Sequence, residues 1–100
     1  MGFPTKTLVV FMFILGDIAM ELQDTADLMK SRDFKDRFKA EYYQLKIRTD
    51  KLAEMLDAYD KGALTFTPKC SITLLTAQHE FMKAYLHTLE ERAVIEGIEL

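Results

Sequence analysis

Residues 71–96 decide the fold, and they read SITLLTAQHEFMKAYLHTLEERAVIE. Side chains suited to a helix interface recur in this stretch at alternating steps of three and four, the spacing of a helix face that packs along another helix. This line consists of Ile72, Leu75, His79, Met82, Leu86, Leu89 and Ala93. Ser71 or Cys70 can cap the start of such a helix and Gly97 can end it, so we predict a helix over 71–96.

A second helix is predicted upstream, over residues 31–60. No glycine or proline interrupts this stretch, and Gly62 follows it, free to take the left-handed conformation that ends a helix. Its apolar side chains recur mostly at steps of three, four and seven: Phe34, Phe38, Tyr42, Leu45, Leu52, Leu56 and Tyr59. Residues 61–70 contain Gly, Pro and two Thr and predict an ordered turn. The fold class is therefore all-α, an antiparallel helical hairpin over 31–100.

The helix over 71–96 also carries a second apolar row, formed by Leu74, Phe81 and Tyr85. One partner helix cannot cover this row and the first line together, because the two lie side by side on the helix surface. A hairpin of this size also buries little area against the cost of ordering its backbone. We therefore expect the N-terminal segment and another copy of the chain to pack on it, giving a homo-oligomer.

Residues 1–30 form a separate apolar N-terminal segment in this interpretation. Its run LVVFMFIL, residues 8–15, is too short to span a membrane, which takes about 20 apolar residues. No convincing cleavage site for a signal peptide follows it. We expect a buried core segment here and consider membrane association unlikely. Whether residues 1–28 form strand, helix or disorder stays open.

Composition excludes several classes of protein. The chain has 100 residues, of which 49% are hydrophobic and 29% charged, as expected for one folded domain rather than a disordered chain. A net charge of -3 argues against nucleic-acid binding, which depends on cations that neutralise phosphate. The single cysteine, Cys70, allows no internal disulfide and fits a reducing cytoplasm.

No pattern in the sequence indicates a catalytic or metal site. His79 and His87 are eight residues apart, not the four that place two zinc ligands on one helix face. Cys70 has no neighbouring base or second thiol, so a buried or capping role is the more economical interpretation. The four glycines are scattered and form no phosphate-binding loop. We therefore predict a protein that is not an enzyme and needs no cofactor.

Charge is unevenly distributed along the chain. Within the first helix the bases Lys35, Arg37, Lys39, Lys46, Arg48 and Lys51 outnumber Asp36, Glu41 and Asp50. The simplest interpretation is a solubilising surface. The functional one is a site for a small anionic ligand between helices, with phosphates held by bases and rings stacked on tyrosine. Its candidate residues are Lys46, Arg48, Lys69 and Arg92 for phosphate, Tyr42 or Tyr85 for stacking and Gln78 for base or ribose contacts.

Residues 34–100 resemble a small helical-hairpin family of phage and prophage genomes labelled crAss-phage-related. The family pattern is matched by Tyr59, Asp60 and Gly62 in the turn, by Phe66, Pro68 and Cys70 in the connection, by Ile72, Leu74 and Leu75 at the start of the second helix, and by Gln78, Met82, Tyr85, Leu89, Glu90, Arg92 and Ala93 within it. The chain departs from the pattern at Ser71, where the family has proline. The label implies a hairpin of viral origin and no particular activity.

A weaker, architectural similarity links the hairpin to phage sponges that oppose CBASS and Thoeris defences, which are short helical hairpins assembled around ligand pockets. None of their ligand motifs is visible here. The working hypothesis is a phage-encoded, non-enzymatic oligomer in the host cytoplasm that sequesters a small anionic nucleotide immune signal between subunits. The alternative is a protein-interaction module or inhibitor that docks on a host or phage protein through its exposed apolar row.

Overall fold

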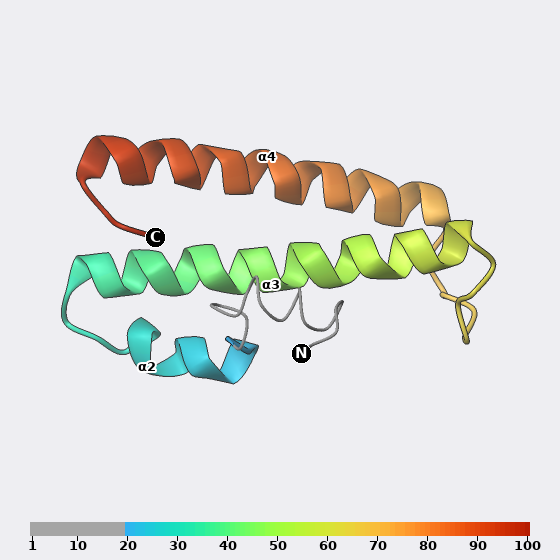
Figure 1. The fold of residues 1–100 in the computed structure, drawn as a ribbon, viewed down its shortest axis with the longest axis horizontal. Helices are drawn as coiled ribbons and strands as arrows, with labels where there is room; N and C mark the ends of the chain where they lie inside the picture. Colours follow the sequence, from blue (N-terminus) through green and yellow to red (C-terminus); the bar gives the residue numbers. More distant parts are fainter. Residues whose placement is uncertain (1–19) are drawn as a thin grey trace, which may run out of the picture.

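The computed structural model describes residues 20–100, and this part of the chain is helical without strands. Its elements are the 3-10 turn η2 (Leu22–Asp24) and the helices α2 (Thr25–Met29), α3 (Phe34–Asp60) and α4 (Ile72–Glu96). In Figure 1, α3 and α4 run antiparallel as a hairpin, and α2 lies against the side of α3 that faces away from α4. The predicted all-α hairpin with an additional N-terminal segment is confirmed.

Side-chain caps and glycines fix where the two long helices begin and end. The Asp33 carboxylate accepts a hydrogen bond from the Lys35 backbone N–H at 3.0 Å, so α3 begins at Phe34, three residues later than predicted. Ser71 caps α4 in the same way, accepting from the Leu74 N–H at 3.1 Å. Gly97 ends α4 with a φ of 71°, as predicted, and Gly62 follows α3 with a φ of 70°.

The hairpin core is concentrated at one end, between the first half of α3 and the last half of α4. It consists of the buried residues Phe38, Tyr42, Leu89, Ala93 and Ile98. Ile98 reaches this cluster because the left-handed turn at Gly97 folds the chain back, and the Ile98 N–H then donates to the Ala93 carbonyl at 2.8 Å. Toward the connection the seam residues of both helices are only half buried.

The short helix α2 packs on α3 through a polar contact. The Thr25 side chain is fully buried, and its hydroxyl accepts a hydrogen bond from Gln44 Nε2 at 3.2 Å. Residues 22–29 therefore pack on the hairpin, as expected for the N-terminal segment. They contact α3 and not α4, so they leave the second apolar row uncovered. The run at residues 8–15 lies outside the described residues.

Candidate functional site

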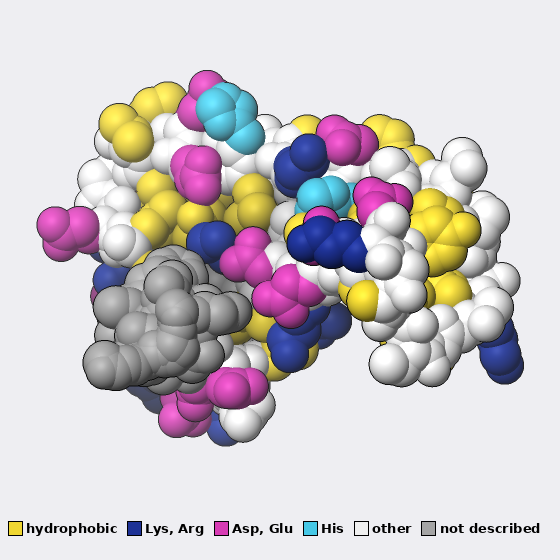
Figure 2. Space-filling model, turned by 45° about the vertical axis from the view of Figure 1, so that its right-hand side comes forward, with side chains coloured by type: hydrophobic (Ala, Val, Ile, Leu, Met, Phe, Trp, Pro, Cys, Tyr) yellow, Lys and Arg dark blue, Asp and Glu magenta, His cyan; other side chains and the backbone are white. Residues whose placement is uncertain are grey.

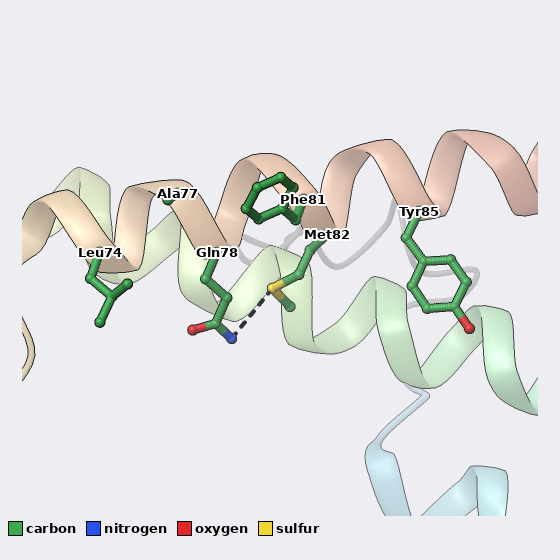
Figure 3. A pocket seen from close by; sticks show the side chains of 6 residues that line it. All are labelled: Leu74, Ala77, Gln78, Phe81, Met82 and Tyr85. Carbon is green, nitrogen blue, oxygen red and sulfur yellow. Dashed lines mark hydrogen bonds between the residues drawn. The ribbon is translucent and has the colours of Figure 1, made fainter.

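An open groove of about 450 Å³ runs along one side of α4. Every residue that lines it belongs to α4: Leu74, Ala77, Gln78, Phe81, Met82 and Tyr85. Figure 3 shows Gln78 and Tyr85 pointing from α4 toward α3, with Met82 between them. The second apolar row predicted from the sequence is therefore the wall of this groove. Phe81 is 75% exposed, so the α4 wall stands open to solvent.

A tyrosine–glutamate pair spans the two helices beside the groove. The Tyr85 hydroxyl donates a hydrogen bond to the Glu41 carboxylate of α3. This bond, more than burial, raises the pKa of Tyr85 above its ordinary value, because the carboxylate stabilises the protonated hydroxyl. Nearby, Gln78 Nε2 lies 3.7 Å from the sulfur of Met82. That contact is weak, so the Gln78 amide remains available to a ligand.

Heptad spacing predicts that Arg48 lies across the hairpin from Gln78. Side chains seven residues apart share a helix face, and the helices are antiparallel. Since Glu41 meets Tyr85, moving one heptad toward the connection on each helix sets Arg48 of α3 across from Gln78 of α4. Arg48 is exposed and pairs with no acid among residues 20–100. Its guanidinium is thus free for an anionic ligand.

The two tyrosines proposed for stacking occupy different environments. Tyr85 lines the groove and is 45% exposed, whereas Tyr42 is a buried member of the core. The Tyr42 hydroxyl donates to Glu90 at 2.8 Å. Burial, reinforced by that bond, raises the pKa of Tyr42 far above its ordinary value of 10.0. Of the two rings, Tyr85 is the one presented to the groove.

The other three candidate cations lie in separate surroundings. Lys46 pairs with Asp50 at 3.0 Å, and Lys69 is exposed in the connection between the helices. Arg92 bonds to Glu96 at 2.9 Å, which raises the pKa of its guanidinium, and it also stacks over the Phe38 ring with its guanidinium carbon 5.0 Å from the ring centre. Of the candidate residues, Gln78 and Tyr85 line the groove, whereas Arg48 is not among the lining residues.

Four residues of α2 and α3 that line a second hollow were not among the candidates predicted from the sequence. Met29, Arg37, Glu41 and Gln44 line this hollow of about 310 Å³, and Glu41 accepts the hydrogen bond from Tyr85 of the groove. The signal was present in the sequence, because Glu41 and Arg48 are one heptad apart, as are Gln78 and Tyr85. Only the register between the helices was lacking, and it comes from the turn and the core packing.

Charged side chains of both signs are intermingled on the surface shown in Figure 2, with apolar groups visible between them. No separate basic face is visible in this view. Among residues 20–100, no three His, Cys, Asp or Glu side chains gather to hold a metal ion. Within the same range, no helix is long and apolar enough to cross a membrane.

The fold and the groove define a class, a small helical hairpin with an open groove along α4 that is lined in part by aromatic rings. The chain belongs to the Sequestin family, whose model matches residues 32–95. The match spans α3, the connection and nearly all of α4, so every residue that lines the groove lies within it. The family name indicates a sequestering binding protein with a non-catalytic role. Neither the curated proteins nor the solved structures contain a match to this chain.

Proposed function

We propose that this protein sequesters a small anionic nucleotide signal in the groove along α4, at an interface between subunits. The observation that carries the proposal is the groove lined by Gln78 and the Tyr85 and Phe81 rings, and the heptad spacing of α3 supports Arg48 as the neighbouring cation. Phosphate requires a cation with free donors, a base requires an aromatic surface, and a ribose or base edge requires an amide.

The dimensions of the groove agree with a ligand of this size. Its volume of about 450 Å³ falls within the range of small-molecule sites. A site for such a ligand normally encloses most of its surface, however, and here α4 supplies one wall only. A second subunit across the groove would supply the missing enclosure, which is why the proposal places the ligand between subunits.

The biological setting is part of the same proposal. The resemblance of residues 34–100 to phage hairpin proteins supports a phage-encoded protein, and membership in the Sequestin family supports capture rather than chemistry. A protein of this kind would act in the host cytoplasm by lowering the free concentration of an immune signal. Stoichiometric capture requires neither a catalytic group nor a cofactor, and we propose neither.

Binding can be tested with a panel of cyclic nucleotides and ADP-ribose-derived nucleotides. A ligand that binds only the folded state raises the melting temperature in proportion to its affinity and concentration. We expect at least one member of the panel to stabilise the protein, and protein purified from infected cells to release an ultraviolet-absorbing molecule on denaturation. An unchanged melting temperature across the panel, with nothing released, contradicts the proposal.

Arg48→Ala should weaken nucleotide binding by about 10- to 100-fold, the effect of losing a charge-assisted hydrogen bond of roughly 1.5 to 3 kcal/mol. The folded state should keep its stability, because Arg48 is exposed and pairs with no acid among the described residues. Arg32→Ala is the matched control, since Arg32 is an exposed guanidinium located before α3 begins. Titration calorimetry of the two variants should show loss of affinity only in Arg48→Ala.

A second candidate function is favoured by the exposed apolar side chains of α4, which would also suit docking on a host or phage protein. Leu74 is 60% exposed and Phe81 75% exposed. The two functions differ in what stays bound during purification. A sequestering protein carries a small molecule, whereas an interaction module retains a defined macromolecular partner in a pull-down and keeps it after extensive nucleotide washing.

A further inference from the structure

One exposed side of α4 carries a heptad line, and part of this line also borders the groove. Leu74, Phe81, Thr88 and Ile95 are spaced by seven, and Ala77 and Ala84 lie beside them; these six residues are here called the outer strip. The strip begins in the first turn of α4 and ends at its penultimate residue. It extends for about 30 Å at 1.5 Å per residue, much longer than a nucleotide. A heptad spacing sustained over this length is typical of a surface that packs along another helix.

We infer that the outer strip packs against the same strip of a second copy of the chain, with the two α4 helices antiparallel about a two-fold axis. A two-fold axis brings the same surface of both copies together, so the apolar strip of one helix meets the apolar strip of the other. The inference deepens the proposed function, because α4 of the second copy would cover the groove that one chain leaves open. It concerns assembly alone, and so it can be tested without any ligand.

Charge favours the antiparallel orientation over the parallel one. From Leu74 to Ala84 the strip itself is uncharged. Glu80 lies beside it, next to Phe81, and Glu91 continues the line of Ala77 and Ala84. Parallel helices would set Glu91 beside Glu91 of the partner subunit. Antiparallel helices set Glu91 beside the uncharged first turns instead, and they also oppose the two helix dipoles favourably.

The exposed area is of the order needed for a stable pair. Leu74, Phe81 and Ile95 are 60%, 75% and 83% exposed, and Tyr85 at the edge of the strip is 45% exposed. Taking roughly 200 Å² for a large apolar side chain, these four present roughly 500 Å² on each copy. The two alanines, Thr88 and flanking stems extend this toward the about 800 Å² per partner of a standard interface.

The mass of the protein without ligand gives the first test. We expect a dimer or an even-numbered assembly by light scattering, and a monomer for Phe81→Glu, because a buried charge at the centre of the strip is costly. Val94→Glu is the matched control: Val94 is 82% exposed but lies about 140° around the helix from Phe81. Val94→Glu should keep the assembly. A monomeric wild type, or an assembly that survives Phe81→Glu, overturns the inference.

Cross-linking tests the orientation. With Leu74 beside Ile95 of the partner subunit, Ala84 lies near the two-fold axis and the two Leu74 positions are about 30 Å apart. In a Cys70→Ser background, Ala84→Cys should form a disulfide-linked dimer on mild oxidation. Leu74→Cys should not, since its sulfurs are far beyond bonding reach. Equal cross-linking of both variants would mean parallel helices and would overturn the proposed arrangement, whether or not any nucleotide binds.

Discussion

Two tyrosine–glutamate hydrogen bonds cross the hairpin, and they run in opposite directions. Tyr42 of α3 donates to Glu90 of α4, and Tyr85 of α4 donates to Glu41 of α3. The acceptors are exposed carboxylates, so neither bond requires a buried charge. The bonds nevertheless differ in role, because Tyr42 is buried in the core whereas Tyr85 borders the groove. Substitution at Tyr42 should therefore affect stability, and substitution at Tyr85 should affect ligand binding.

Tyr42→Phe should lower the free energy of unfolding by about 1 kcal/mol near neutral pH, the net value of one hydrogen bond. The effect depends on pH because the folded state holds the pKa of Tyr42 above its ordinary value of 10.0. Stabilisation is complete below pH 10 and falls as pH rises toward the raised folded pKa, since the unfolded state releases the proton first. Urea titrations from pH 8 to 11 should show the wild type losing its advantage over Tyr42→Phe above pH 10. A constant difference would contradict this account.

At the residue scale, the sequence could identify candidate side chains for a ligand site but not which side chains contact each other. Arg48, Gln78 and Tyr85 were all predicted as candidates, yet Lys46 and Arg92 looked equally suitable on charge alone. Their acids, Asp50 and Glu96, are four residues away on the same helices, so both ion pairs could have been anticipated. The bonds from Tyr42 to Glu90 and from Tyr85 to Glu41 join residues more than 40 positions apart, and only the register determines them.

At the scale of elements, the stability of α4 depends on the two residues that flank it, Ser71 and Gly97. Ser71→Ala should lower the free energy of unfolding by about 1 kcal/mol, because the Leu74 N–H loses its acceptor at the helix N-terminus. Thr73→Ala is the control, as Thr73 is an exposed residue in the first turn. Thermal unfolding followed by circular dichroism should show a lower midpoint for Ser71→Ala alone. Similar midpoints for the two variants would show that the cap contributes little.

The helices themselves followed closely from the sequence. A regular spacing of three and four, a capping serine and a terminal glycine predicted α4 to within one residue at its start. The first helix was extended three residues too far at its N-terminus, since Ser31 and Arg32 have acceptable helix propensities but Asp33 is the better cap. The short helix α2 was not delimited, because a five-residue helix carries too few turns to show a period.

For the whole molecule, the uneven core predicts uneven stability. All five residues of the core cluster lie at the end of the hairpin away from the connection. Amide hydrogens of residues 52–60 and 72–80 should therefore exchange faster than those of 38–45 and 86–93, because local opening costs less where fewer side chains are buried. Hydrogen exchange with peptide-level detection would reveal the gradient. Uniform protection along α3 and α4 would contradict it.

The arrangement of α2, α3 and α4 could be predicted only in part. Composition and the second apolar row of α4 indicated that a bare hairpin would leave surface uncovered, and this is what the exposure of Phe81 shows. Which element lies where depends on contacts without a sequence signature, such as that of Gln44 with Thr25, which sets α2 against α3. The division into a segment over 1–30 and a hairpin over 31–100 stays a prediction.

Because of the turn at Gly97, α3 and α4 are held together at both ends of the hairpin. At one end a covalent connection holds α3 to α4; at the other, Ile98 inserts between them and the Gly97 carbonyl accepts a hydrogen bond from Lys35 Nζ at 3.3 Å. Gly97 and Ile98 thus hold the two helices together at this end. The helices cannot separate there unless these contacts break first. A chain cut just before Ile98 would keep both helices and lose the fastening that holds them shut.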